Sequence, residues 1–223
     1  LAKIPYDPLR DFVPIVPVAF GALVVAANNA AGINTLEELI STARAKPGAL
    51  SYASAGTGAS NHLSMELLKT MAGIRMLHIP YKGATLAITE LIGGQIVLYA
   101  SSMPPALPLI QAGKLKALGM TALARSPLAP EIPTVSETGL PGYQANIWNG
   151  ILAPAATPRS LITRLNQELL RVLSTADMRE RFAALGADCA HSTPEEFRAF
   201  IAAEEKKWAK VIRETGMRAE LER

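Results

Sequence analysis

Apolar and polar positions follow one another along the chain in blocks that predict strands and helices in turn. Two apolar runs of strand length, residues 12–19 and 22–27, read as consecutive buried strands. Thr35 then opens a helix with a capping-box pattern, because Glu38 stands three positions later. Further strands are predicted over residues 75–80, 96–99 and 115–121, and further helices over residues 84–92 and 106–112. This alternation is typical of a mostly parallel sheet covered by helices, so it predicts an α/β fold.

The segment over residues 50–68, LSYASAGTGASNHLSMELL, organises this part of the chain. It begins as a strand, breaks into small residues, and resumes as an amphipathic helix that ends near Gly73. Ser60 and Asn61 are both good N-cap residues, so the helix is predicted to begin there. Free backbone N–H groups and the positive end of a helix dipole make such a turn a binding place for an anion.

The residues of the turn favour a small carboxylate over a nucleotide. No Lys follows Gly58, which excludes a Walker loop, and Asn61 stands where the dinucleotide fingerprint needs a third glycine. The turn also carries no Lys or Arg to neutralise a phosphate. Gly56 and Gly58 let the backbone approach a ligand, and Ser54 and Thr57 add hydroxyl groups. A second interpretation stays open, in which the glycines serve only a tight βα turn.

Three predicted loops follow the carboxyl ends of neighbouring strands, where ligands of open α/β sheets bind. They cover residues 54–60, 81–83 and 100–102. The last third of the chain differs, with a strand-like run over residues 143–153 and then charged helices. The last helix is capped by Thr193 and is predicted to be a solvated face around an apolar stripe.

Composition narrows the class of protein. The chain has 223 residues, a hydrophobic content of 49% and a net charge of +3, with no basic stripe, so no nucleic-acid partner is expected. The longest apolar run contains Pro14 and Pro17 and is too short to span a bilayer. Cys189 is the single cysteine, which excludes an internal disulfide and a cysteine-based metal cluster.

Candidate chemistry points to binding without catalysis. His62, His78 and His191 match no metal-ligand spacing, and no nucleophile elbow of the G-x-S-x-G type occurs. His62 either donates to a bound carboxylate or packs in the core, whereas His78 is expected to be a core residue. We therefore expect no catalytic residue, no metal and no cofactor.

Several ordered segments give the chain a close resemblance to a known family. They are PYDPLRDFVPI at residues 5–15, TLEELISTARAKPGALSYASAGTGASNHL at 35–63, HIPYKGA at 78–84 and TPEEFRAFIAAEEKKWAKVI at 193–212. With these segments the chain resembles the Bug (TctC-like) solute receptors, the extracytoplasmic binding components of tripartite tricarboxylate transporters.

The resemblance implies a type II periplasmic-binding-protein fold with two lobes of mostly parallel sheets. In that scheme residues 1–20 are a remnant of lobe I with a hinge strand, residues 21–146 form lobe II, and residues 147–223 return to lobe I. It implies a monomeric periplasmic receptor that captures a small organic carboxylate between the lobes and delivers it to permease subunits in the membrane. The ligand-binding residues that we expect are Ser54, Ala55, Gly56, Thr57, Gly58, His62, Tyr81, Ser101 and Trp148.

The sequence departs from the family pattern in two places. Family members usually carry a further segment before the PYDP landmark, so lobe I is expected to be incomplete at its N-terminus and ligand binding by this chain alone to be weak or absent. Residues 100–102 read Ala-Ser-Ser, where relatives often show an aromatic residue, an Asp and an Asn. Without that acid, an amino-acid ligand is less expected.

Two other functions are compatible with the sequence. A ligand-sensing module for a sensor kinase would bind in the same way and differ only in its partner. An acyl-transfer enzyme using Ser54 or Ser60 with His62 is the second alternative, and the lack of an elbow and of an orienting acid counts against it.

Overall fold

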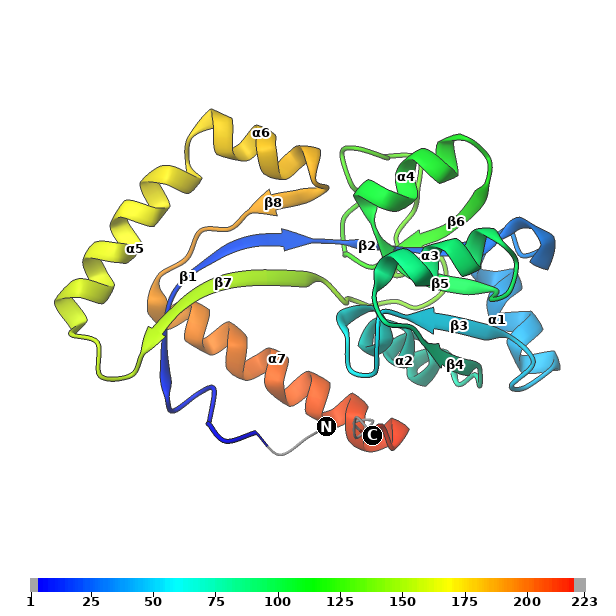
Figure 1. Cartoon of the computed structure of the whole chain (residues 1–223), viewed down its shortest axis with the longest axis horizontal. Helices are drawn as coiled ribbons and strands as arrows, with labels where there is room; N and C mark the ends of the chain where they lie inside the picture. Colours follow the sequence, from blue (N-terminus) through cyan, green and yellow to red (C-terminus); the bar gives the residue numbers. More distant parts are fainter. Residues whose placement is uncertain (1–3, 219–223) are drawn as a thin grey trace. The chain divides into compact units, whose positions relative to one another are not determined.

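The computed structural model describes residues 4–218, which divide into two compact units (Figure 1). One unit consists of Ala22–Asn146 together with the chain from Val211. The other consists of the residues up to Gly21 together with Ile147–Lys210. The assignment of these parts to the lobes of a receptor stays a prediction.

The first unit is built on a five-stranded sheet with the strand order β4-β3-β5-β2-β6. Its strands are β2 (Leu23–Asn28), β3 (Ser51–Ser54), β4 (Leu77–Pro80), β5 (Leu98–Ser102) and β6 (Leu115–Met120). β3 is parallel to both β4 and β5, whereas β2 is antiparallel to both β5 and β6. The sheet is therefore mixed: β4, β3, β5 and β6 run in one direction, and β2, between β5 and β6, runs in the other. β2 enters the sheet at the carboxyl end of β5, where Leu23 pairs with Ser102.

Short helices connect these strands. They are the 3-10 helix η1 (Asn29–Ala31) and the α-helices α1 (Leu36–Ala45), α2 (Ser60–Ala72), α3 (Ala84–Ile92) and α4 (Met103–Gln111). Thr35 caps α1 as predicted, since its Oγ1 accepts the Glu38 N–H at 3.1 Å. The Glu38 carboxylate, however, accepts the N–H of Asn34 at 2.7 Å. The capping box thus extends one residue further back than its usual form.

Successive residues of β3 face the helices on opposite sides of the sheet. Ala53 packs in a core cluster with Ala87 and Leu91 of α3. Tyr52 is fully buried and donates its hydroxyl to Glu66 of α2. The period of two along a strand therefore gives β3 one apolar face and one face with polar groups, which include Ser54.

The second unit is an antiparallel sheet with three helices. Its strand order is β7-β1-β8, with β1 (Phe12–Gly21), β7 (Ile147–Pro154) and β8 (Ala187–Cys189). The helices are α5 (Arg159–Leu173), α6 (Ala176–Ala184) and α7 (Pro194–Thr215), of which residues through Lys210 belong to this unit. In this unit the expectation of mostly parallel strands is wrong, because β1 and β7 pair antiparallel from Phe12↔Pro154 to Gly21↔Ile147.

The helix and strand predictions for this region hold with one omission. α7 begins at a complete capping box: the Thr193 N–H donates to Glu196 Oε2 at 2.8 Å, and the Glu196 N–H donates to Thr193 Oγ1 at 3.2 Å. The predicted runs over residues 12–19 and 22–27 are consecutive strands, and they belong to different sheets. β8, with only three residues, was not predicted.

Aromatic residues form the packing between α7 and the sheet of the second unit. Phe20 on β1 and Trp148 on β7 each meet Phe200 edge to face, at centroid distances of 5.2 and 5.4 Å. Phe197 also meets Trp148 edge to face at 5.8 Å. These contacts account for part of the apolar stripe predicted along the last helix.

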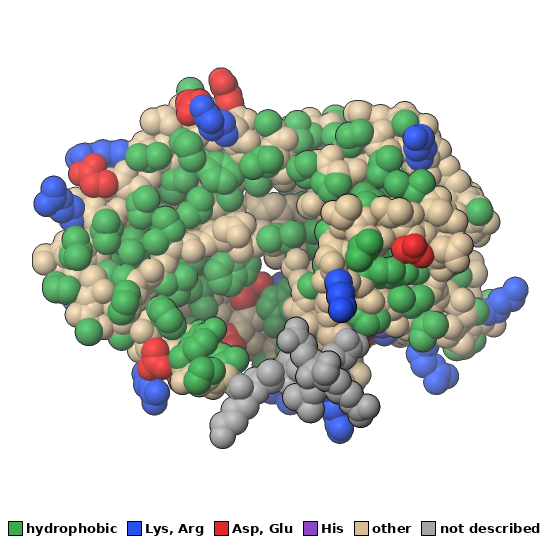
Figure 2. All heavy atoms as spheres, in the orientation of Figure 1, with side chains coloured by type: hydrophobic (Ala, Val, Ile, Leu, Met, Phe, Trp, Pro, Cys, Tyr) green, Lys and Arg blue, Asp and Glu red, His purple; other side chains and the backbone are tan. Residues whose placement is uncertain are grey.

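Charged side chains are scattered singly or in small groups over the face shown in Figure 2, with acidic and basic residues interspersed.

Among residues 4–218, no helix has both the length and the apolar character that crossing a bilayer requires.

Candidate ligand-binding site

The predicted loops do meet at one edge of the five-stranded sheet. β3 lies between β4 and β5 and runs parallel to both, so the strand ends at Ser54, Pro80 and Ser102 share that edge. The loop after β3 contacts the loop after β4, since the Tyr81 N–H donates to the Ser54 carbonyl at 3.0 Å. The convergence of loops inferred from the sequence is therefore present in the fold.

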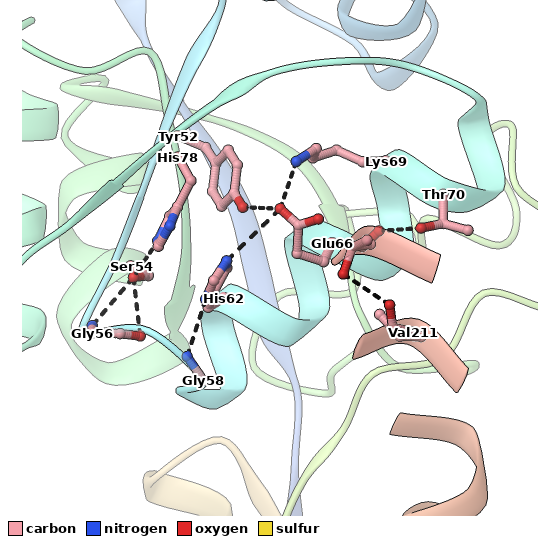
Figure 3. Close-up of polar contacts among 11 residues, drawn as sticks. Tyr52, Ser54, Gly56, Gly58, His62, Glu66, Lys69, Thr70, His78 and Val211 are labelled. Atoms are coloured by element: carbon pink, nitrogen blue, oxygen red, sulfur yellow. Dashed lines mark hydrogen bonds and ion pairs between the residues drawn. The ribbon is translucent and has the colours of Figure 1, made fainter. Parts of the chain in front are cut away.

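The loop after β3 depends on its two glycines. Gly56 has a φ of 135° and Gly58 a φ of 86°, both in the region that side chains with a Cβ rarely adopt. At both positions glycine is needed for the backbone conformation. Figure 3 shows the turn between β3 and the start of α2, with the polar side chains gathered beside it.

Most N–H groups of this loop are bonded within the protein. The Ala55 N–H donates to Asn61 Oδ1 at 3.1 Å and the Gly56 N–H to Ser54 Oγ at 3.2 Å. The Gly58 N–H donates to His62 Nδ1 at 3.0 Å. These amides, which we expected to face a ligand, instead fix the shape of the loop.

The N-terminus of α2 carries no side-chain cap. The N-cap residue is Ala59, so the expectation that Ser60 or Asn61 caps the helix is wrong. Asn61 is turned back to the loop, and its amide nitrogen donates to the Tyr99 hydroxyl at 2.9 Å. The N–H groups of the first helical turn have no acceptor within the helix and lie at the positive end of its dipole.

Thr57 is the second group in the loop with unused hydrogen-bonding capacity. Its Oγ1 is buried and has no partner among the residues that the structure describes. A buried hydroxyl without a partner is costly, so this atom is a candidate for contact with a ligand.

His62 is buried, with 4% of its surface exposed, and lies at the centre of the polar cluster in Figure 3. Because Nδ1 accepts the Gly58 N–H, the neutral ring must carry its proton on Nε2. Nε2 lies 3.8 Å from Glu66 Oε1. Burial, and then the neighbouring His78, lower the pKa of His62 to about 4, so the ring is neutral at physiological pH.

Glu66 anchors the other end of this cluster. Its carboxylate accepts hydrogen bonds from the Tyr52 hydroxyl and from Lys69 Nζ, the latter at 2.5 Å. Burial, and then the bond to Glu66, raise the pKa of the Tyr52 hydroxyl, which keeps it protonated as a donor. Lys69 is thus paired with Glu66, and the ion pair adds no net charge to the site.

Ser54 and His78 form a second, partly buried contact. Ser54 Oγ lies 2.7 Å from His78 Nε2 and donates to the Gly56 carbonyl at 3.1 Å. Ser54 is fully buried. The alternative of acyl transfer paired Ser54 with His62, but its partner is His78, and His62 contacts the loop backbone instead. His78 is half-buried on the edge strand β4 rather than in the core.

The remaining predicted site residues lie in different surroundings. Tyr81 is half-buried and packs against the core cluster that includes Ala53 and Tyr99. Ser101 is buried on β5 and donates to the Ser102 carbonyl at 3.1 Å. Trp148 belongs to the second unit, so its place in the ligand site stays a prediction.

Sequence reasoning missed Tyr52, Asn61, Glu66, Lys69 and His78 as parts of the site. Spacing could have found some of them: His62 and Glu66 are four residues apart on one helix, and Glu66 and Lys69 are three apart. The contact of His78 needs the register between β3 and β4, in which Tyr52 pairs with His78, and no local pattern gives that register. Within residues 4–218, no group of three or more His, Cys, Asp and Glu suits a metal ion.

Comparisons with known proteins agree with the fold. The family model described as the tripartite tricarboxylate transporter family receptor matches residues 1–217. A UPF0065 protein from the tcbD-tcbE intergenic region of Pseudomonas sp. (strain P51) is 38% identical over 97% of this chain and 65% of its own length. Protein BugT of Bordetella pertussis is 36% identical over 97% of this chain and 66% of its own. The chain thus spans about two thirds of the length of these relatives.

Solved structures give the same result. The chain superimposes on Rpa4515 of R. palustris with adipate at a TM-score of 0.85 and 30% identity, over 98% of this chain and 73% of the other. For MatC (Rpa3494) from Rhodopseudomonas palustris with bound malate, the TM-score is 0.81 and the identity 29%, over 95% and 73%. With a family match along nearly its whole length, the chain belongs to the receptors of the tripartite tricarboxylate transporter family.

Proposed function

We propose that the protein is a solute receptor that binds a small organic carboxylate and delivers it to permease subunits of a tripartite tricarboxylate transporter, on the outer side of the membrane in the periplasm. The observation that carries this proposal is the uncapped N-terminus of α2 behind a loop of fixed shape. Uncapped first-turn amides and the helix dipole suit an anion of modest charge.

The absence of a free cation in the loop supports a carboxylate over a phosphate. Residues 54–60 contain no Lys or Arg, and Lys69 is already paired with Glu66. Two related receptors are described with adipate and with malate, both dicarboxylates, which supports the same class of ligand for this chain.

The proposed ligand contacts are the first-turn amides of α2, the Thr57 hydroxyl and Tyr81, with Ser101 and Trp148 as further candidates from the family resemblance. The same site has a frame that gives the loop its shape. This frame consists of Ser54, Ala55, Gly56, Gly58 and His62. Their hydrogen-bonding groups hold the loop, so they shape the place where the carboxylate binds.

We infer that the receptor does not turn its ligand over. Ser54 Oγ is bonded to the Gly56 backbone within its own turn, and burial closes it to a substrate. An acyl-transfer enzyme needs a nucleophile that can reach a carbonyl carbon and an acid that orients the histidine. A flat ester-hydrolysis assay for the wild type and the Ser54→Ala variant alike is the expected result.

Calorimetric titration with mono-, di- and tricarboxylates tests the proposal, using this chain and any longer form of the protein that contains it. We expect one or a few acids to bind and to raise the melting temperature, because a ligand of the native state stabilises it. Gly58→Ala should weaken binding, whereas Gly48→Ala should not, although Gly48 has a similar φ of 82° and so carries a similar strain. Binding of no acid by any form would overturn the receptor assignment.

A further inference from the structure

Three polar side chains fix the loop after β3, because each accepts a hydrogen bond from one backbone amide of the loop. Ser54, Asn61 and His62 accept the N–H groups of Gly56, Ala55 and Gly58, respectively. Two of these side chains are themselves fixed by a further group: Asn61 donates to the Tyr99 hydroxyl, and Ser54 contacts His78. These hydrogen bonds within the protein order the loop, which lowers the entropic cost of binding.

His62 differs from Ser54 and Asn61 because protonation of its ring removes the hydrogen-bond acceptor, Nδ1. Nδ1 accepts the Gly58 N–H only while it is unprotonated. A proton on Nδ1 would place two N–H donors against each other and break the contact.

The groups around His62 come from three elements. The His78 ring of β4 stacks on it at 3.7 Å between centroids, and the Tyr52 ring of β3 lies at 6.1 Å. On α2 itself, Glu66 Oε1 lies 3.8 Å from Nε2 and is shared with Lys69. A charge on the ring is opposed by burial, by His78 and by Lys69, and is favoured by Glu66 alone.

We propose that His62 is a positioning residue for carboxylate binding: its neutral ring holds the Gly58 N–H through Nδ1 and so fixes the loop, and protonation of Nδ1 releases both the loop and the ligand. This inference rests on the proposed function. It assigns to His62 a role in the shape of the site, in place of a direct contact with the ligand.

Nuclear magnetic resonance of the wild type tests the hydrogen bond without any variant or ligand. In uniformly ¹⁵N-labelled protein, an N–H···N bond gives a scalar coupling between the Gly58 amide nitrogen and His62 Nδ1. We expect this coupling near neutral pH, together with imidazole shifts of the Nε2–H form, and we expect its loss in acid. A His62 ring with its proton on Nδ1 at neutral pH would overturn the proposal.

Two variants test the role in binding. In His62→Asn the side-chain oxygen takes the place of Nδ1 and keeps an acceptor for Gly58, whereas His62→Gln carries its amide further out, near the place of Nε2. We expect His62→Asn to bind within about threefold of the wild type and His62→Gln to bind about tenfold more weakly, with faster amide exchange at Gly58. The matched controls are His191→Asn and His191→Gln, since His191 is exposed and contacts Ser174 in the second unit.

The outcomes separate this inference from the proposed function. Equal affinity of the two His62 variants for the acid that the wild type binds would overturn the role of His62 alone. If the wild type binds no acid, the receptor proposal fails, and the ¹⁵N coupling still decides whether His62 holds the loop. Should His62→Gln fail to fold, the loss of the coupling in acid and a parallel rise in the exchange rate of the Gly58 amide in the wild type, both measured without ligand, test whether His62 holds the loop.

Discussion

The rings of His62 and His78 stack with their centroids 3.7 Å apart and 14° between their planes. One ring comes from the first turn of α2 and the other from the edge strand β4. Each ring also contacts the loop after β3, His62 through the Gly58 N–H and His78 through Ser54 Oγ. The pair therefore connects the loop to two elements, the edge strand β4 and the helix α2.

Acid should destabilise the protein through His62. Its pKa is lowered to about 4 in the folded state, from the ordinary value of 6.5 for a histidine, so the unfolded chain binds the proton more tightly. The stabilisation is present above about pH 6.5 and is lost as the pH falls toward 4, by about 3 kcal/mol. Urea unfolding across this range should show the loss in the wild type and a smaller one in His62→Asn. Parallel curves for the two proteins would contradict the expectation.

Removing the charge of Glu66 should be costly, because its partners are buried with it. The side chains of Glu66 and Lys69 are only 6% and 17% exposed. Glu66→Leu leaves Lys69 and the Tyr52 hydroxyl without their acceptor, and we expect a loss of about 3 kcal/mol in the free energy of unfolding. The control is Glu168→Leu, since Glu168 and Arg171 form a pair of the same spacing that is 56% and 74% exposed, and its loss should stay below about 1 kcal/mol.

A double variant separates the charge from the packing. Glu66→Leu with Lys69→Met removes both charges, so it should recover part of the stability lost in the single variant. No recovery would mean that packing around Glu66, and not its ion pair, accounts for the cost.

The same Thr-to-Val change should affect stability differently at two positions whose hydroxyl groups are buried. Thr57 Oγ1 has no partner among the described residues, so Thr57→Val should leave stability unchanged or raised, while lowering carboxylate affinity about tenfold if the hydroxyl binds the ligand. Thr121 Oγ1 accepts the Leu23 N–H at 2.8 Å, so Thr121→Val should cost about 1–3 kcal/mol. Thermal unfolding and calorimetric titration measure both; a strong loss of stability at Thr57 would contradict the assignment.

Gly150 should tolerate no side chain. A Cβ at this position would lie 2.2 Å from Phe197 Cζ and 3.3 Å from the Val16 carbonyl. Gly150→Ala should therefore cost about 2–3 kcal/mol in urea unfolding through overpacking. Gly21→Ala is the control, because a Cβ there meets only Ala187 Cβ and the Gly186 carbonyl, both at 3.8 Å. Trimming the ring with Phe197→Leu should rescue Gly150→Ala if the clash is the cause.

Local signals in the sequence predicted local structure well. The capping patterns at Thr35 and Thr193 marked the starts of α1 and α7, and Gly73 marked the end of α2 in the left-handed conformation. These features depend on neighbours within a few residues, so the sequence carries them directly. The cap of α2 was the exception: Asn61 bonds the Ala55 N–H and leaves Ala59 as the N-cap.

Features that depend on distant pairing could not be read from the sequence. The direction of β2 follows from where the chain enters the sheet, and the apolar run itself reads the same in a parallel or an antiparallel strand. The contact between Ser54 and His78 likewise depends on the register of β3 with β4. The loop was found from its glycines, but the side chains that hold it come from a strand and a helix that only the fold brings beside it.

The pairing of Gly21 with Ile147 at the end of the β1–β7 ladder has a consequence for engineering. The chain leaves the antiparallel sheet after one of these residues and returns to it at the other, so the whole Ala22–Asn146 segment enters and exits at a single rung. A segment with adjacent ends can be excised, exchanged for that of a relative, or circularly permuted with a short linker. Chimeras joined at this rung, with the chain from Val211 taken from the same relative, would transfer the loop and its histidine pair between receptors together.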